Sequence, residues 1–282
     1  MLPFSTCSVL LRFTYSSAAL KFLRYASLQS YQAISDSPFL VSLASPRHPA
    51  NESAFNSPLT PMPYGNGYTY SRSITIYHAK VSNTDQSNFP VLISGTYSYL
   101  ATTANGGNVQ NSNGYDVIFT SDAGCANKLN HEVETYSATT GAVNYWVKVP
   151  TVSHSSDTTI YLCYGNSIIT ADQSNKTAVW DANYKGVWHL PNGSSLSATD
   201  STANANGGTI SGVVAAAAKT DGGGSFNGAS DRIEVKAGKV DTSATTGTVS
   251  AWVKISALDT NGAVLGYGGS GAALWGVYIR LV

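Results

Sequence analysis

Two glutamates in a strand-like segment are the residues of this chain best suited to catalysis. Successive side chains of a β-strand point to opposite faces, so Glu132 and Glu134 would share one face with their Cα atoms about 6.5–7 Å apart. Two carboxylates in a groove are what glycoside hydrolysis requires, one as the acid and the other as the nucleophile or base. The next position on that face is Tyr136, whereas His131 shares the opposite face with Thr135, in half-buried packing. We therefore favour the simpler alternative, in which the two glutamates lie on the solvated face of an outer strand.

Two tryptophans and an asparagine are the candidates for binding a sugar. In residues 143–149, Asn144 and Trp146 alternate with apolar residues, and Trp252 holds a similar position in the expected strand 248–255. A flat ring on an open sheet face can stack on the apolar C–H groups of a sugar, while an amide hydrogen-bonds its hydroxyls. The sequence thus predicts ligand contacts at Trp146, Asn144 and Trp252. The alternative is that both sheet faces are covered and each tryptophan fills a core.

Two aspartates are candidate ligands for a metal ion. Asp200 and Asp231 lie in loops rich in asparagine and glycine, and they supply the hard oxygen ligands that calcium prefers. Their spacing does not follow the EF-hand loop. We predict no required cofactor and, at most, one structural calcium ion. Loops of this composition are also simply turns, and that alternative stays open.

The overall composition argues against two broad classes of protein. Among 282 residues, Lys plus Arg and Asp plus Glu both number 16, so the formal net charge is zero. Nucleic-acid binders carry a basic face, so we expect no nucleic-acid partner. No apolar run approaches the roughly 20 residues that a transmembrane helix needs, so we expect no transmembrane segment. The abundance of uncharged polar residues, with 26 glycines and 17 tyrosines, is typical of secreted β-proteins.

Short runs with period-two alternation, separated by Asn/Gly/Ser clusters, predict the fold. Such runs fit half-buried strands, and many of them at regular spacing favour β-sandwiches. We predict an all-β protein of two antiparallel jelly-roll sandwiches in tandem. The expected divisions are a disordered leader with a Pro/Gly linker at 1–67, a first sandwich at 68–181, and a second, incomplete sandwich at 182–282. The pentapeptides 145–149 and 251–255 resemble each other and suggest the same kind of strand in both.

The three cysteines carry a weak signal. Cys7 falls in the expected leader, Cys125 in a glycine-containing loop and Cys163 in a strand-like segment. Cys125 and Cys163 could pair in an oxidising compartment, but we expect two isolated thiols. No spacing of cysteine and histidine indicates zinc.

Six separated segments resemble, in sequence and order, the bacterial domain-of-unknown-function family 2341 over roughly residues 68–181. They are YSRSITI at 70–76, NFPVLI at 88–93, NGYDVIFT at 113–120, LNHEVE at 129–134, YWVKVP at 145–150 and TIYLCYGN at 159–166. The family is uncharacterised, so the resemblance implies no catalytic residues. It implies an extracellular module of a larger modular protein.

The remaining segments resemble a laminin-G-like jelly roll of the concanavalin-A-like lectin and glucanase superfamily, at about 186–282. They are GVWHL at 186–190, DSTANANGG at 200–208, GSFNG at 224–228, DRI at 231–233 and TVSAWVK at 248–254. Domains of that kind continue for several strands beyond the position of Val282. The resemblance therefore implies that the second module is truncated.

Three functions are compatible with these observations. The first is a non-catalytic carbohydrate-binding or adhesion module of a bacterial surface protein, extracellular although no clean signal peptide is seen. It would bind a polysaccharide or surface glycan beside other domains of a longer protein. The second is a concanavalin-A-like glucanase that uses Glu132 and Glu134. The third is a structural spacer without a ligand. We expect the first, and hence a protein that is not an enzyme.

Overall fold

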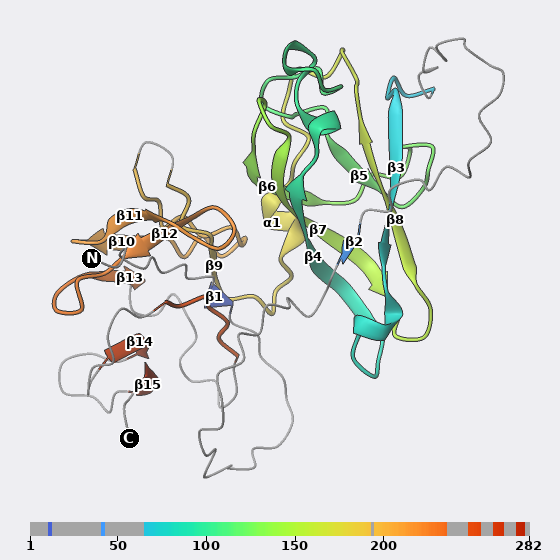
Figure 1. Ribbon diagram of the computed structural model, residues 1–282. Coiled ribbons are helices and arrows are strands. Elements are labelled where there is room, and N and C mark those ends of the chain that lie inside the picture. The colour runs from blue at the N-terminus through green and yellow to red at the C-terminus, as the bar shows by residue number, and fades with distance from the viewer. Residues whose placement is uncertain are drawn as a thin grey trace. The chain divides into compact units, whose positions relative to one another are not determined.

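The described part of the chain is nearly all β, with several antiparallel sheets, as the sequence predicts (Figure 1). The computed structural model describes residues 65–192, 195–235 and 248–254, and the backbone of four further strands at 11–12, 41–42, 262–267 and 275–279. Two compact units are formed, Leu20–Asp181 and Ala182–Val282 with Met1–Ala19. Most of the expected leader and linker, 1–67, lies outside the described residues. Within the described part, no helix is long and apolar enough to cross a bilayer.

The unit Leu20–Asp181 contains two antiparallel sheets. One has the strand order β2-β3-β8-β5 and the other has the order β4-β7-β6 (Figure 1). The strands of the first sheet are β2 (Val41–Ser42), β3 (Tyr70–Ile76), β5 (Ile118–Thr120) and β8 (Thr158–Tyr164). The strands of the second are β4 (Gln86–Thr96), β6 (His131–Tyr136) and β7 (Ala142–Val152).

The alternating apolar residues of these strands form a single core cluster. Strands β3 and β8 contribute Ile74, Ile76, Ile160 and Leu162, and β4 and β7 contribute Val91, Ile93, Val143, Tyr145, Val147 and Val149. Successive side chains of a strand alternate between faces, which is why every second residue of these segments points into this core. A tight turn precedes β7 at Gly141, whose φ is +68°, and a Cβ there would lie 2.0 Å from the Tyr97 carbonyl oxygen.

Four short helical segments connect the strands. Helix α1 (Lys176–Val179) follows the sandwich and contacts β6 and β7. The others are single turns of 3₁₀ helix, η1 (His78–Lys80), η2 (Ser98–Leu100) and η3 (Thr103–Asn105).

A disulfide bond joins Cys125 to Cys163, with their Cα atoms 5.9 Å apart. The prediction of two isolated thiols is therefore wrong. Asp122 shapes the loop that carries Cys125, because it accepts backbone hydrogen bonds from Asn127 and Ala126 at 2.7 and 3.2 Å. These bonds lower the pKa of Asp122. The pairing depends on this folded loop, which local spacing does not reveal.

In the unit Ala182–Val282 with Met1–Ala19, the described residues form four two-stranded antiparallel sheets. The pairs are β1 (Leu11–Arg12) with β9 (Val187–Trp188), β10 (Gly208–Ser211) with β13 (Arg232–Val235), β11 (Val214–Ala217) with β12 (Gly222–Ser225), and β14 (Gly262–Tyr267) with β15 (Trp275–Ile279). Residues 249–254 form no strand, so the expected strand 248–255 and its likeness to 145–149 are not confirmed. Ile255 lies outside the described residues.

Candidate functional site

Glutamate–tryptophan hydrogen bonds dominate the outer face of β6 and β7. The Trp180 indole Nε1 donates to Glu132 Oε2 at 2.8 Å, and Trp146 Nε1 donates to Glu134 Oε2 at 2.6 Å. The two indole rings lie 5.3 Å apart. Glu132 is only 4% exposed and each tryptophan only 3%. The expectations of a solvated Glu132 and an open Trp146 ring are therefore wrong, because Trp180, directly after α1, packs over this face.

A β-bulge at Glu134 changes which side chains share that face. Opposite β7, Val133 pairs with Tyr145 and Thr135 pairs with Asn144, so Glu134 is the extra residue. A bulge shifts the alternation by one position. Thr135 therefore accompanies Glu132 on the outer face, and Tyr136 turns inward, which is the reverse of the sequence expectation.

The same bulge places Asn144 in a hydrogen-bonded row across the outer face. The Asn144 amide donates to Thr135 Oγ1 at 2.8 Å, and the Ser94 hydroxyl donates to Asn144 Oδ1 at 2.6 Å. Asn144 is 8% exposed. These bonds hold β4, β7 and β6 together, so the amide predicted to bind a ligand already has partners from both neighbouring strands.

His131 is fully buried on the opposite face of β6, not half-buried as expected. It lies 5.6 Å from the Phe119 ring and 6.1 Å from the Tyr145 ring, measured between centroids. Burial lowers the His131 pKa to about 4. The imidazole is therefore neutral near pH 7 and fills the core.

Asp200 organises a loop of the unit Ala182–Val282. Its Oδ1 accepts the backbone N–H groups of Val187 and Thr202, both at 2.9 Å. Its Oδ2 accepts the Thr202 hydroxyl and the Asn206 N–H, both at 2.8 Å. The carboxylate is thus engaged by four donors while only 5% exposed. It borders a depression of about 430 Å³, lined by residues 195–200, 205, 207 and 208.

Asp231 and Trp252 are the other predicted site residues of this unit. Asp231 Oδ2 accepts the backbone N–H of Asn227 at 2.9 Å, within a turn. Trp252 is 41% exposed, and Lys219 Nζ lies 5.6 Å from its ring centroid. Among the described residues, no group of three or more His, Cys, Asp or Glu side chains could hold a metal ion. Calcium binding and ligand contact at Trp252 stay predictions.

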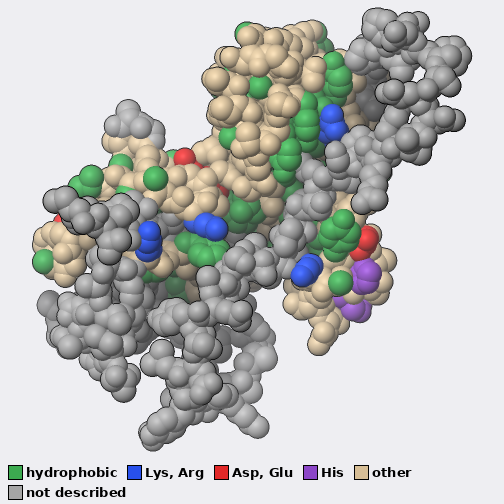
Figure 2. Space-filling view, viewed as in Figure 1, with side chains coloured by type: hydrophobic (Ala, Val, Ile, Leu, Met, Phe, Trp, Pro, Cys, Tyr) green, Lys and Arg blue, Asp and Glu red, His purple; other side chains and the backbone are tan. Residues whose placement is uncertain are grey.

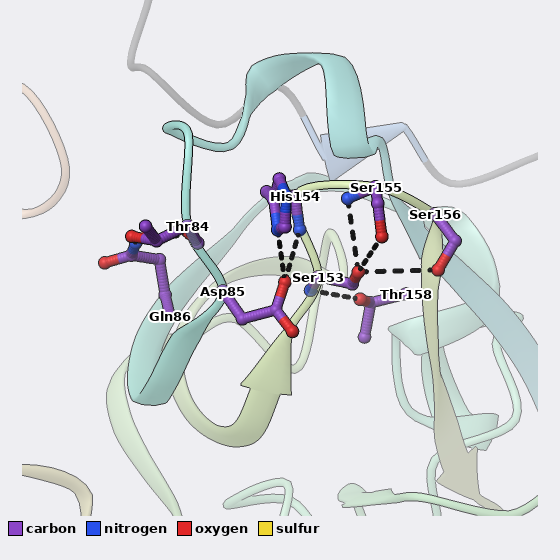
Figure 3. Close-up of polar contacts among 8 residues, drawn as sticks. All are labelled: Thr84, Asp85, Gln86, Ser153, His154, Ser155, Ser156 and Thr158. Atoms are coloured by element: carbon purple, nitrogen blue, oxygen red, sulfur yellow. Dashed lines mark hydrogen bonds and ion pairs between the residues drawn. The ribbon is translucent and has the colours of Figure 1, made fainter.

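Two reciprocal histidine–aspartate pairs join the loops at one end of the first sandwich, and we call them the loop clasp. Asp157 Oδ1 accepts the His78 backbone N–H at 2.9 Å and lies 2.7 Å from its ring Nδ1. Asp85 Oδ1 contacts His154 in the same way, at 2.9 and 2.6 Å (Figure 3). The backbone N–H bond, and then the ring bond, lower the pKa of each aspartate. The clasp links the β3–β4 and β7–β8 loops, both of which cross between the sheets.

An aspartate-oriented imidazole beside serines is also the arrangement of a nucleophilic catalyst. Figure 3 shows that Ser153 bonds instead within its own loop. Its hydroxyl accepts the Ser155 N–H at 3.2 Å and the Ser156 hydroxyl at 3.4 Å. Within the described residues, no serine hydroxyl bonds to the His154 ring. Figure 2 shows histidine side chains beside acidic ones at the surface of this tip. They belong to the two clasp pairs, because His131 and His189 are buried. The loop clasp therefore holds the β3–β4 and β7–β8 loops together.

Four tyrosines close the other end of the sandwich, and we call them the tyrosine column. Tyr70 and Tyr164 pair across β3 and β8, with ring centroids 5.1 Å apart and planes at 16°. Tyr97 and Tyr99 follow the end of β4, in the other sheet. Their rings stack at 5.6 Å, and Tyr99 stacks on Tyr164 at 5.6 Å. The column thus bridges the two sheets where their strands end.

The column combines a buried member with half-buried ones. Tyr164 is 1% exposed, whereas Tyr70, Tyr97 and Tyr99 are half-buried. Burial raises the pKa of Tyr97 and Tyr164, and raises that of Tyr99 to about 12. The hydroxyls of Tyr97, Tyr99 and Tyr164 therefore remain neutral at physiological pH. Each can donate and accept a hydrogen bond beside an apolar ring.

Arg72 is held against the column. Its Cζ lies 3.9 Å from the Tyr99 ring centroid, and its Nε donates to the Tyr164 hydroxyl at 2.9 Å. A guanidinium over an aromatic face is attracted by the ring quadrupole. Arg72 is half-buried and shares one face of β3 with Tyr70 and Ile74. One face of β3 therefore runs from the core, through the cation, to the column.

A buried aspartate fixes the backbone beneath the column. Asp116 is fully buried, and its Oδ2 accepts the backbone N–H groups of Gly165 and Asn166 at 3.1 and 3.3 Å. It also accepts the N–H groups of Gln110 and Asn111, both at 2.9 Å. The bonds hold Gly165 at φ +81°, where a Cβ would lie 2.6 Å from the Tyr70 ring.

Sequence reasoning missed the column and Arg72. The signal was present in the spacing of two residues between Tyr97 and Tyr99, and between Tyr70 and Arg72, which places each pair on one side of an extended segment. These pairs lie at strand ends in different sheets, so their meeting depends on the stacking of the sheets. The predicted site residues, by contrast, are divided between the two units: Glu132, Glu134, Asn144 and Trp146 in one, and Asp200, Asp231 and Trp252 in the other.

One family model matches this chain. It is described as Domain of unknown function (DUF2341), and it covers residues 113–187. The resemblance to family 2341 is confirmed over that range, which contains the disulfide, Asp116 and the glutamate–tryptophan pairs. No curated protein and no solved structure matches the chain. The likeness of 186–282 to a laminin-G-like jelly roll stays a prediction.

Proposed function

We propose that this protein is a non-catalytic, extracellular glycan-binding module of a bacterial surface protein, with the tyrosine column as its recognition surface. The carrying observation is that Tyr70, Tyr97 and Tyr99 are half-buried in one stack at the end of a rigid sandwich. Tyrosine offers an apolar ring and a hydroxyl with few rotatable bonds, so little conformational entropy is lost when it contacts a ligand. A sugar presents the complementary mixture of C–H and hydroxyl groups.

The surroundings of the column support rigid presentation. The Tyr97 hydroxyl donates to the Ser94 carbonyl at 3.3 Å, and the Tyr136 hydroxyl donates to the Leu100 carbonyl at 2.9 Å. These bonds fasten the segment that carries Tyr97 and Tyr99 to β4 and β6. A preorganised site loses less free energy on binding than one that must first be ordered.

Two further observations favour this proposal over the alternatives. Glu132 is buried, and both glutamates accept indole hydrogen bonds, which gives hydrolysis little support. The disulfide supports an oxidising, extracellular compartment, because cytosolic thiols are kept reduced. A spacer without a ligand would have no need to leave three tyrosines half-exposed in a stack.

The test is a titration of the full chain against a panel of polysaccharides by isothermal calorimetry, with Tyr99→Ala and Tyr97→Ala beside the native protein. We expect at least one polysaccharide to bind, and each substitution to weaken that binding about tenfold or more. Tyr77→Ala is the matched control, since Tyr77 is 42% exposed and follows the far end of β3.

Circular dichroism of every variant checks that it is folded. If the spectra and melting curves of Tyr97→Ala and Tyr99→Ala match those of Tyr77→Ala, both column variants are folded, and a loss of binding cannot be attributed to unfolding. Folded column variants that bind as well as the native protein would show that the column is only a core cap. Absence of binding to every polysaccharide by the folded native protein would favour the spacer.

A further inference from the structure

We propose that Arg72 makes the tyrosine column selective for acidic sugars, through a charge-assisted hydrogen bond to the carboxylate of a uronic acid. This inference rests on the proposed function and names its ligand class. The placement of the guanidinium carries it: one cation is held in the recognition surface by an aromatic ring on one side and a hydroxyl on the other.

The guanidinium is oriented before any ligand arrives. Its Cζ lies 3.9 Å from the centroid of the Tyr99 ring, and its Nε donates to the Tyr164 hydroxyl at 2.9 Å, so two contacts restrain the group. The Nε donor is consumed by this bond. The two terminal nitrogens still carry four N–H donors, arranged as the planar fork that matches a carboxylate.

The charge of Arg72 has no compensating carboxylate among the described residues. Arg72 takes part in none of the ion pairs found there, which include His78 with Asp157, His154 with Asp85, and Arg232 with Glu234. Asp116 lies in the same end of the sandwich but is engaged by four backbone donors. A half-buried cation without an anionic partner favours an anionic ligand, because partial desolvation strengthens its attraction to a carboxylate.

The neighbouring rings select a sugar acid over a simple anion. Tyr99 contributes a half-buried ring and a neutral hydroxyl beside the cation, and Tyr70 contributes a half-buried ring on the same face of β3. A pyranose that carries a carboxylate offers C–H groups to the rings, hydroxyls to the tyrosine hydroxyls, and the anion to Arg72. A small anion, such as acetate, would use only the last of these contacts.

The experiment compares polygalacturonate with the same polymer after reduction of its carboxyl groups to alcohols, so the ligands differ only in the charged group. Binding to the full chain is measured by calorimetry at low and at moderate salt. We expect polygalacturonate to bind at least tenfold more tightly than the reduced polymer, and the difference to shrink as salt screens the charge.

Three variants test whether Arg72 is the group that binds the carboxylate of the ligand. Arg72→Met should weaken binding to polygalacturonate at least tenfold and remove the preference, so that both polymers bind with similar affinity. Arg72→Lys, which keeps the charge but not the fork, should restore only part of it. Arg232→Met is the control, because Arg232 has an exposed side chain in the other unit and should leave both affinities unchanged. Melting curves exclude unfolding.

The outcomes separate this inference from the proposed function. Equal binding of both polymers, unaffected by Arg72→Met, would contradict the acidic-sugar inference and leave glycan binding in place. Failure of both polymers, with every neutral polysaccharide also failing, would contradict both. Dextran sulfate tests general attraction of polyanions: if it binds as tightly as polygalacturonate, and Arg232→Met weakens both, Arg72 has no specific role.

Discussion

The disulfide between Cys125 and Cys163 should be a principal support of the first sandwich. The two residues are 38 positions apart, and closing a loop of that length removes about 4 kcal/mol of chain entropy from the unfolded state at 25 °C. Both cysteines are buried, at 3% and 0% exposure, so the native packing also favours the link. We expect reduction to lower the free energy of unfolding by about that amount.

Peptide-resolved hydrogen exchange of the full chain is the appropriate assay. Amides of β7 and β8 that exchange only by global opening should exchange about three orders of magnitude faster after reduction, since each 1.4 kcal/mol is tenfold. Both cysteines lie in the unit Leu20–Asp181, so peptides from 182–235 are an internal control.

Substitution separates loop closure from packing. Cys125→Ala and Cys163→Ala remove the same link but different side chains, so similar acceleration in both, equal to that of reduction, indicates the link itself. Cys7→Ser should leave the rates unchanged. The reasoning is refuted if the unreduced, denatured chain titrates with three free thiols instead of one, or if reduction leaves the exchange rates of β7 and β8 as they were.

Three further outcomes are expected of buried polar groups in the same sandwich. Glu132→Ala should cost about 2–3 kcal/mol and red-shift tryptophan emission, because the buried Trp180 N–H loses its acceptor. Glu132→Gln should cost less; loss of a glucan hydrolysis activity at unchanged stability would instead support the hydrolase. The native His131 pKa of about 4 lies below its ordinary value of 6.5, so burial of the neutral ring contributes fully to the free energy of unfolding above pH 6.5. That contribution decreases as the pH falls towards 4, and at pH 5 it is smaller by about 2 kcal/mol. His131→Phe should flatten that slope in urea titrations at several pH values, and an unchanged slope contradicts the assignment. The buried Tyr145 hydroxyl has no hydrogen-bond partner among the described residues, so Tyr145→Phe should leave stability equal or raise it by about 1 kcal/mol, and a melting temperature lowered by several degrees would show an overlooked partner.

The fold class was predictable because strand alternation is a local signal. Ile74 and Ile76 are buried where the period-two pattern places them, and so are Val147 and Val149. Such a pattern follows from the two faces of a strand, so it does not depend on contacts with residues distant in the sequence. The matched family range, 113–187, includes Val147 and Val149.

The site was less predictable, because its geometry depends on contacts distant in sequence. The bulge at Glu134 exchanges the faces of Thr135 and Tyr136, although nothing in the alternating segment signals an extra residue. Trp146 was expected on an open face, but Trp180, 34 positions later, packs against it. Alternation distinguishes two faces of a strand without showing what covers either of them.

The two ends of the sandwich show why Arg72, rather than the histidines, points to a ligand. At the loop clasp, each aspartate is engaged by its histidine through both backbone and ring nitrogens, so the exposed charges there already have partners. At the opposite end, the tyrosine column contributes rings and a hydroxyl to Arg72 but no negative charge. If Arg72 only packed against the column, a neutral residue could fill the same position. A cation oriented on two sides, with terminal donors left over, is explained better by an anion that arrives from outside the described chain.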